Sequence, residues 1–283
     1  MVQKLIFLLI NVKFRGGLGN QIFQYAVARA LMNSNDYLLF DTSSYLNDYL
    51  ERKFRLNNLQ IIGTEIQNKF IHKFFVKGSK PNQVISKLGL FYFIQENGLC
   101  IHSNLKEKKR AITSIQGYWQ SEVYFKSLKD VLQKELTPVK IPSLPAFIDN
   151  NQTVSVHIRR TDYLEDKRYG FLGENYYREA MQICKEQIKN PMFVFFSDDI
   201  EWCKNTFKEN NILYVDDFSW QTDYLQLYLM SKCRHHIIAN STFSWWGAWL
   251  NTNEAKIVIR PKVPFNDPSL CYESHYPPEW ISI

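Results

Sequence analysis

Charged side chains gather at the end of an apolar run in the segment VSVHIRRTDYL, residues 154–164. His157, Arg159, Arg160 and Asp162 fall within six positions of one another. A guanidinium is always charged, and its fork of N–H donors matches the oxygens of a diphosphate. Successive strand residues face opposite sides. One arginine is therefore expected to face a ligand. The other, Arg160, is expected to face the protein, with Asp162 as its anchor. A surface salt-bridge cluster is the alternative interpretation.

A pair of carboxylates follows a second apolar run, in MFVFFSDD. Asp198 and Asp199 invite two interpretations. One is a Mg²⁺ site that would carry the phosphate charge of a nucleotide sugar. The other is a carboxylate that accepts hydrogen bonds from the N1–H and N2–H₂ edge of guanine. Because two arginines already supply positive charge nearby, we favour the guanine contact by Asp198 or Asp199 over a metal.

Two further segments contain groups that suit a phosphate. Ser241 and Thr242 precede an apolar helix in IIANSTFSWW, which is typical of a helix N-cap. The start of a helix offers free N–H groups and a partial positive charge, although a plain cap explains the residues equally well.

The turn RGGLGN at 15–20 lacks the Lys-Ser/Thr pair of a Walker loop and the full G-x-G-x-x-G. Its glycines still permit close approach of a ligand to the backbone.

Aromatic residues are concentrated in GYWQSE at 117–122 and FSWWGAW at 243–249. Aromatic rings can stack on sugar faces, but tryptophans at helical spacing more often belong to a core. We expect a core role for the tryptophans of the second segment, Trp245, Trp246 and Trp249. Trp119 lies beside Gln120 and Glu122, and for it a role in a binding cleft and a role in the core are both open.

The elements that must position these residues alternate along the chain. Apolar runs predict strands, and apolar residues at helical spacing predict helices. The predicted strands are at 4–12, 37–41, 153–158, 192–196, 212–215, 235–239 and 255–260; the predicted helices are at 21–34, 174–189, 199–208, 222–232 and 241–251. Strands that alternate with helices predict a parallel α/β sheet, in which ligands bind at the carboxyl ends of the strands. All the polar clusters described above follow predicted strands.

The segment TPVKIPSLPAF at 137–147 contains three prolines and is the predicted linker. It divides the chain into two Rossmann-like domains, residues 1–145 and 146–283, which we expect to face each other across a cleft. Residues 50–115 are less regular. Within them KFIHKFFVKGSK at 69–80 interleaves apolar residues with lysines. It is either a helix with solvated lysines or a segment that lies on a membrane surface.

Composition narrows the function classes. The chain has 283 residues, a hydrophobic content of 45% and a net charge of +6. This mild charge suits an anionic small ligand, and nucleic-acid binding is not expected. The five cysteines are widely spaced with no C-x-x-C, which predicts a reduced, cytoplasmic protein without a zinc site. The apolar run near the N-terminus is too short for a membrane span and lacks a cleavage site, so neither a signal peptide nor a transmembrane helix is predicted.

Taken together and in this order, five segments resemble the bacterial α-1,2-fucosyltransferases of glycosyltransferase family 11. They are GGLGNQIFQYAVARAL, GYWQSEVYF, HIRRTDYL, FVFFSDDIEWCK and IIANSTFSWWGAWL. The resemblance runs almost end to end and is weakest over residues 60–110. It implies a GT-B fold with an acceptor-side first domain and a GDP-fucose-binding second domain. It also implies inverting transfer of L-fucose from GDP-β-L-fucose to the 2-hydroxyl of a terminal β-galactoside, with no cofactor or metal. Many members build O-antigen or capsule repeats on a lipid carrier at the inner membrane face, so peripheral membrane contact is a further expectation.

The resemblance also assigns roles to residues. Arg159 is the expected catalytic residue and diphosphate contact, flanked by Arg160 and Asp162. His157 and Asp198 are the expected neighbours of guanine. Other donor-binding residues are expected at the start of the last helix and in the glycine turn: Ser241, Thr242, Phe243, Gly17, Gly19 and Asn20. Trp119, Gln120 and Glu122 are the acceptor candidates. Thr161 stands where many bacterial relatives have glycine.

The chemistry that follows is stabilisation of charge on the departing β-phosphate, which Arg159 and the helix start at Ser241 would provide. The sequence names no convincing base for the acceptor hydroxyl; Glu122, Asp162 and Asp41 are the candidates. Two alternatives stay open at this point. One is a metal-dependent nucleotide-sugar transferase that uses Asp198 and Asp199, and the other is a non-catalytic carbohydrate-binding protein that uses the tryptophan clusters.

Overall fold

The structure is a computed structural model that describes residues 8–47, 52–66, 69–76, 78–96, 105–149, 152–267 and 274–283. The chain divides into two compact units, residues 1–136 and 137–283, called here the N-terminal unit and the C-terminal unit. The boundary therefore precedes the proline-rich segment, whereas the sequence places it at 145/146. No helix in the described ranges is long and apolar enough to cross a membrane.

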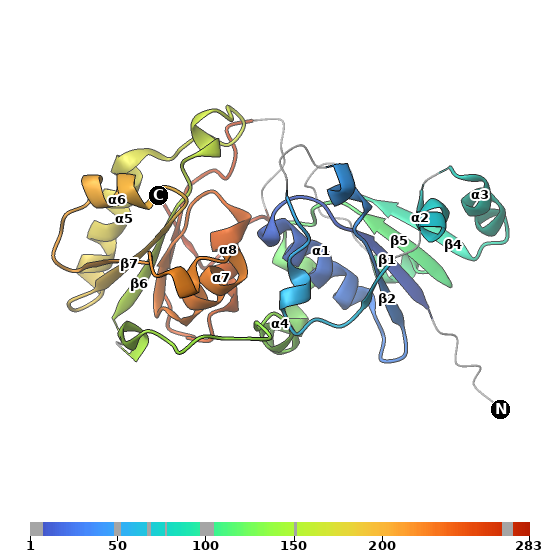
Figure 1. The fold of residues 1–283 in the computed structure, drawn as a ribbon, viewed down its shortest axis with the longest axis horizontal. Coiled ribbons are helices and arrows are strands. Elements are labelled where there is room, and N and C mark those ends of the chain that lie inside the picture. Colours follow the sequence, from blue (N-terminus) through green and yellow to red (C-terminus); the bar gives the residue numbers. More distant parts are fainter. Residues whose placement is uncertain are drawn as a thin grey trace. The chain divides into compact units, whose positions relative to one another are not determined.

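The N-terminal unit contains a parallel sheet with the strand order β3-β2-β1-β5-β4 (Figure 1). Its strands are β1 (Leu9–Lys13), β2 (Tyr37–Asp41), β3 (Thr64–Glu65), β4 (Phe91–Gln95) and β5 (Ile112–Gln116). Its α-helices are α1 (Leu18–Leu31), α2 (Lys69–Phe75), α3 (Lys80–Lys87) and α4 (Lys129–Glu135). The first strand begins later than predicted, and residues 4–7 of the predicted strand lie outside the described residues.

The irregular stretch before residue 115 contains more structure than its sequence pattern predicts. Strands β4 and β5 both come from it. The lysine-rich segment 69–80 is not one helix: α2 ends at Phe75, and α3 begins at Lys80 after Gly78, whose φ is +82°. Only glycine adopts this conformation without strain, so the chain turns there instead of continuing the helix.

The C-terminal unit contains a second parallel sheet, with the order β11-β10-β9-β6-β7-β8. Its strands are β6 (Thr153–Ile158), β7 (Met192–Ser197), β8 (Ile212–Tyr214), β9 (His235–Ile237), β10 (Val258–Arg260) and β11 (Ile281–Ser282). Its α-helices are α5 (Gly173–Gln187), α6 (Ile200–Thr206), α7 (Asp223–Lys232) and α8 (Thr242–Leu250). The predicted strands and helices of this half are confirmed to within a few residues, and β11 is an additional strand.

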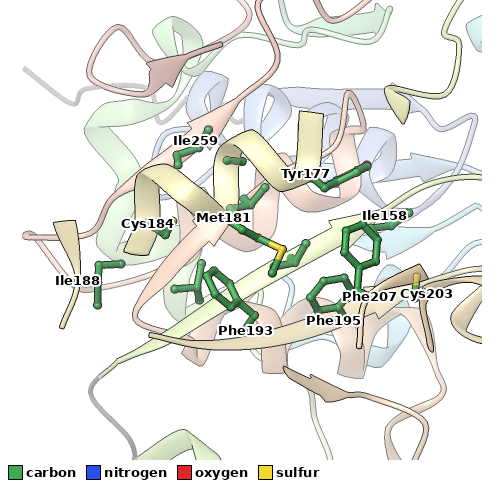
Figure 2. Close-up of a cluster of buried hydrophobic side chains, with 14 residues drawn as sticks. Ile158, Tyr177, Met181, Cys184, Ile188, Phe193, Phe195, Cys203, Phe207 and Ile259 are labelled. Atoms are coloured by element: carbon green, nitrogen blue, oxygen red, sulfur yellow. The ribbon is translucent and has the colours of Figure 1, made fainter. Parts of the chain in front are cut away.

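The central strands of the C-terminal unit are buried on both faces, as expected for a parallel sheet. Phe193 and Phe195 of β7 pack with Tyr177 and Met181 of α5 (Figure 2). The alternate residues of β7 pack on the opposite side, against residues of α7 and Trp220. Helices therefore cover both faces, and only the ends of the strands are left to contact a ligand.

Several composition-based expectations can be compared with the structure. The predicted α/β class, with two Rossmann-like halves, is confirmed. The predicted core role of the tryptophans in α8 is also confirmed: Trp245 and Trp246 are 0% exposed and Trp249 is 4% exposed. Cys184, Cys203 and Cys233 are free and buried, and the other two cysteines lie outside the described residues.

Candidate functional site

Three of the predicted polar clusters meet at the carboxyl edge of the C-terminal sheet. Strands β9, β6 and β7 are neighbours in that order, and all three run parallel. Ile158, the last residue of β6, pairs with Ser197, the last residue of β7. The loops after these three strands therefore start at the same edge. Figure 1 shows β6 and β7 side by side in the C-terminal unit.

Arg159 is held by two carboxylates. Its Nε and one terminal nitrogen donate to the two oxygens of Asp162, each at 2.8 Å. Its other terminal nitrogen lies 3.2 Å from Oδ2 of Asp198. Burial alone would lower the pKa of the guanidinium, but the hydrogen bond to Asp162 and the charge of Asp198 outweigh this, and the net pKa is raised. These contacts use three of the five N–H groups of the side chain, which is 35% exposed.

Arg160 has a different partner from Arg159. Its guanidinium contacts Oδ2 of Asp199 at 2.5 Å and lies 5.0 Å from the ring centre of Trp202. The expectation that Asp162 anchors Arg160 is therefore wrong. The strand ends at Ile158, so the two arginines lie in the following loop and do not follow the alternation of a strand. Asp162 anchors the ligand-facing candidate, Arg159.

Asp198 holds the loop after β6. Its Oδ1 accepts a hydrogen bond from the backbone N–H of Arg160 at 2.9 Å. Its Oδ2 accepts from the backbone N–H of Thr161 at 3.2 Å and from the Thr161 hydroxyl at 2.5 Å, and it also contacts Arg159. Both oxygens of Asp198 are therefore engaged by this loop. Its expected contact with guanine stays a prediction.

His157 lies under the loop. It is 5% exposed, and its ring packs 5.3 Å from that of Phe243, centre to centre. Burial, followed by the charge of Arg159, lowers the pKa of His157 to about 3, so the ring is neutral at physiological pH. Within the described ranges, no group forms a hydrogen bond with its Nδ1. A neutral, buried ring nitrogen is suited to a single hydrogen bond with a nucleobase.

The start of α8 completes this edge. Ser241 is the N-cap, and its Oγ accepts a hydrogen bond from the N–H of Phe243 at 3.3 Å. The preceding residue, Asn240, donates from its amide to the carbonyls of Tyr169 and Gly170. The predicted cap is confirmed, and the helix start follows β9 at the same edge of the sheet as Arg159.

The predicted donor and acceptor residues of the N-terminal unit also lie at the carboxyl edge of their sheet. Gly16 has a φ of +80°, and Gly17 is the N-cap of α1, where no side chain caps the helix. Gly19 and Asn20 therefore lie in the first turn of α1, whereas the sequence places them in the preceding turn. Asn20 Oδ1 accepts from the amide of Gln120 at 2.8 Å, which joins a predicted donor residue to a predicted acceptor residue.

A half-buried acid that the sequence interpretation missed holds the loop after β5. The carboxylate of Glu96, directly after β4, accepts from the backbone N–H groups of Tyr118 at 2.6 Å and Trp119 at 2.9 Å. Arg15, also missed, lies over the ring of Tyr118 at 4.1 Å. The signal was present: the run FYFIQ is followed directly by the acid Glu96, much as YLLFD ends in Asp41.

The acceptor candidates differ in exposure. Trp119 is 0% exposed and packs edge-to-face against Tyr124, so its ring offers no free face to a sugar in this conformation. Its φ of +58° shows that the loop turns sharply there. Glu122 lies in the short 3-10 helix Glu122–Tyr124 and is half-buried. Gln120 and Glu122 are the acceptor candidates with accessible surface.

Asp162 and Asp41, which the sequence offers as candidate bases, both have local partners. Asp162 pairs with Arg159. Asp41 is 3% exposed and accepts from the N–H of Ser43 at 3.0 Å, while Nδ1 of His72 lies 2.9 Å from the same oxygen. Both carboxylates are therefore committed to local contacts.

The residues of the metal-dependent alternative fit a cation poorly. Asp198 accepts four donors from the loop after β6, as described above. Asp199 accepts from the N–H of Trp202 as the cap of α6 and pairs with Arg160. In the described part of the chain, no group of three or more His, Cys, Asp or Glu residues is arranged to hold a metal ion. Metal independence itself stays a prediction.

Comparison with known proteins identifies the family. A family profile described as "Glycosyl transferase family 11" matches residues 107–283, which is more than half of the chain. The chain belongs to glycosyltransferase family 11. The family 11 chain is 34% identical to an alpha-1,2-colitosyltransferase of Escherichia coli, over 97% of this chain and 99% of that protein. It is 32% identical to the O-antigen biosynthesis glycosyltransferase WbnK of Escherichia coli, over 87% and 92%.

Two more distant proteins are also similar to this chain. The human galactoside alpha-(1,2)-fucosyltransferase 1 is 23% identical over 95% of this chain and 73% of that protein. The solved structure of fucosyltransferase NodZ from Bradyrhizobium has a TM-score of 0.48 and 13% identity, over 86% of this chain and 93% of that chain. This family 11 chain is a glycosyltransferase with two parallel α/β units, and the expected GT-B type stays a prediction. The alternative of a non-catalytic carbohydrate-binding protein is set aside.

Proposed function

We propose that this protein transfers L-fucose from GDP-β-L-fucose to the 2-hydroxyl of a terminal β-galactoside, with inversion at the anomeric carbon and without a metal. The observation that carries the proposal is the position of Arg159. It stands at the carboxyl edge of a parallel sheet, fixed by two carboxylates, with N–H groups left over. The names of the family members, which include a galactoside alpha-(1,2)-fucosyltransferase, support the sugar and the linkage.

The residues at this edge suit the parts of the donor. The two remaining N–H groups of Arg159 can donate to β-phosphate oxygens. The N–H groups at the start of α8 add partial positive charge. The neutral ring of His157 can form one hydrogen bond with guanine. Asp162 and Asp198 hold the Arg159 guanidinium in place before the donor binds, so little reorganisation is needed when charge develops.

The reaction balances without an added reagent. The bond from the fucose anomeric carbon to the β-phosphate oxygen breaks, and its electron pair leaves with GDP. The galactose 2-oxygen bonds to the opposite face of that carbon, and its proton passes to a base or to solvent. Because charge accumulates on the β-phosphate, the group that faces it contributes most to the rate, and we assign this role to Arg159.

A second donor is favoured by one specific observation. The relative with 34% identity over almost the full length of both chains is a colitosyltransferase. We therefore keep colitosyl transfer as the second candidate activity. The name of the other Escherichia coli relative supports a place in O-antigen assembly for either activity.

The deciding experiment offers the protein GDP-fucose or GDP-activated colitose together with a panel of galactosides, followed by linkage analysis of the product. We expect GDP release and a 2-linked α-fucoside, with activity that survives excess EDTA. A product only with colitose would select the second candidate. Activity abolished by EDTA and restored by Mg²⁺ would restore the metal-dependent alternative. No transfer from either donor would contradict the proposal.

A further inference from the structure

An unusual surface lies at the edge of the N-terminal unit, on α2, α3 and the turn that leads into β4. Six apolar residues there are exposed, from 42% for Ile71 to 67% for Leu88. The six are Ile71, Phe74, Val76, Val84, Leu88 and Leu90, and they define the α2–α3 surface. Helices α2 and α3 contact each other, and α3 also contacts β4, at the edge of the sheet (Figure 1). Single exposed apolar residues are ordinary, but six of them on two helices that contact each other, and on the turn that follows, make this surface a candidate interaction site.

The exposed residues of α3 follow helical spacing. Lys80, Val84, Lys87 and Leu88 are spaced three or four positions apart, and all are exposed. The opposite side of the helix packs inward: Asn82 is 6% exposed, and Ile85 packs against a cluster of buried residues that includes Phe75 and Phe91. The exposed stripe is therefore not the core face of this helix. It mixes apolar and cationic side chains, as the faces of helices that lie in a membrane interface do.

The charge of the segment has one sign. Residues 69–90 contain five lysines and no aspartate or glutamate. The exposed members of this set include Lys73, Lys80 and Lys87. By contrast, the basic segment KEKKR at 106–110 contains Glu107. A surface with uniform positive charge and exposed apolar groups complements a surface with anionic headgroups over an apolar layer.

We propose that the α2–α3 surface binds the face of an anionic lipid bilayer. The lysines would contact headgroup phosphates, and the apolar residues would enter the boundary with the acyl chains. A second copy of this chain is a poorer occupant, because a two-fold interface would place lysines against lysines. The proposal does not depend on the donor assigned above: a protein that failed to transfer fucose would still bind lipid through this surface.

The test is flotation of the full chain with vesicles of phosphatidylcholine plus phosphatidylglycerol, compared with vesicles of phosphatidylcholine alone. One variant removes charge (Lys80→Glu with Lys87→Glu), and one removes apolar surface (Val84→Ser with Leu88→Ser). A matched control makes the same charge change outside the surface, at the exposed residues Lys106→Glu and Lys108→Glu. Each variant is also assayed with a water-soluble galactoside.

We expect the wild type to float with the anionic vesicles only. The charge variant should lose binding at least tenfold, because each lysine near an anionic surface contributes about a factor of five. The apolar variant should also lose binding, because it has less apolar surface to bury at the boundary with the acyl chains. The control should stay within about twofold of the wild type, and transfer to the water-soluble acceptor should be unchanged in all three. The proposal is overturned by equal binding to both vesicle types, by no binding to either, by an equal loss in the control, or by a concentration-dependent dimer that the Val84/Leu88 variant abolishes.

Discussion

Asp198 in the C-terminal unit and Glu96 in the N-terminal unit hold their loops by the same device. Each acid directly follows a strand and accepts the N–H groups of two consecutive residues in the loop after the neighbouring strand. The loop after β6 is fixed in this way by Asp198, and the loop after β5 by Glu96. A carboxylate that accepts backbone N–H groups orders a loop without covering its outer face. Both sheets therefore present an ordered loop at the edge where ligands bind.

The two loops carry different chemistry. The loop held by Asp198 contains two arginines, and Asp198 itself contacts Arg159. The loop held by Glu96 contributes a tyrosine that stacks with Arg15 and a glutamine that reaches Asn20. Burial raises the pKa of Glu96, although the N–H groups of Tyr118 and Trp119 and the charge of Arg15 oppose the rise. Under the proposed function, the C-terminal edge with its two arginines would take the nucleotide part of the donor, and the loop held by Glu96 would take the sugar acceptor.

The largest expected effect is a loss of turnover when the guanidinium of Arg159 is removed from the carboxyl edge of the C-terminal sheet. Arg159→Ala should lower kcat by about 10²–10³, because a single donor aimed at a developing anion has this effect. Arg168→Ala removes a guanidinium from the same unit, where the side chain is 68% exposed and pairs with Asp166, and it should change kcat by less than about twofold. Steady-state kinetics with donor and acceptor measure both. Near-normal turnover of Arg159→Ala, with a preserved melting temperature, would remove Arg159 from the mechanism.

The next prediction compares substitutions of the two acids that hold the loops, Asp198 and Glu96. Asp198→Asn replaces an acceptor oxygen with an N–H donor opposite other donors, so the Arg159 loop should lose its fixed position and kcat should fall by about 10–100-fold. Glu96→Gln should act on the other substrate, raising KM for the acceptor by about tenfold and leaving KM for the donor unchanged. Thr161→Ala is a milder variant that removes only the hydroxyl contact with Asp198. If both acids affected the same KM, the assignment of one edge to each substrate would be wrong.

Acid should weaken the C-terminal unit before the N-terminal unit. Burial lowers the pKa of His157, His235 and His236, so below their ordinary pKa of about 6.5 the unfolded chain binds more protons than the folded one. Their contribution to stability is complete above that pH and is lost as the pH falls. Each can remove at most about 1.4 kcal/mol of unfolding free energy per pH unit. Protonation of Glu96 has the opposite effect on stability, because a raised carboxyl pKa favours the folded state as the pH falls.

Hydrogen exchange read peptide by peptide, corrected for intrinsic rates, measures this difference between neutral and mildly acidic pH. His236 is an informative position: Ser155 Oγ lies 2.7 Å from its Nδ1, and the amide of Asn251 lies 2.9 Å from its Nε2. Because that amide also donates to the Cys233 carbonyl, Nε2 must accept, and a second ring proton would have no partner. His236→Gln should reduce the acid sensitivity of β6 and β9. Equal loosening of α1 and α5 would contradict the account.

The sequence was sufficient to predict the strands and site residues whose positions follow from periodicity. Apolar runs located β6, β7 and β9, and the rule that ligands bind at the carboxyl ends located Arg159, Asp198 and Ser241 at one edge. It failed where tertiary contacts decide the result. Which arginine pairs with Asp162 depended on where β6 ends. The burial of the Trp119 ring depended on a turn with positive φ that Glu96 holds. Neither the end of a strand nor a contact between distant loops leaves a periodic signal.

The central claim is that Arg159 contacts the diphosphate of a guanosine nucleotide, and a calorimetric titration with GDP and with guanosine tests it most directly. In Arg159→Ala we expect GDP affinity to fall by about 10–100-fold, the effect of a lost charge-assisted hydrogen bond. Guanosine, which has no phosphate, should bind the wild type and the variant equally. Unchanged GDP affinity in a folded Arg159→Ala variant, or an equal loss for guanosine, would contradict the account.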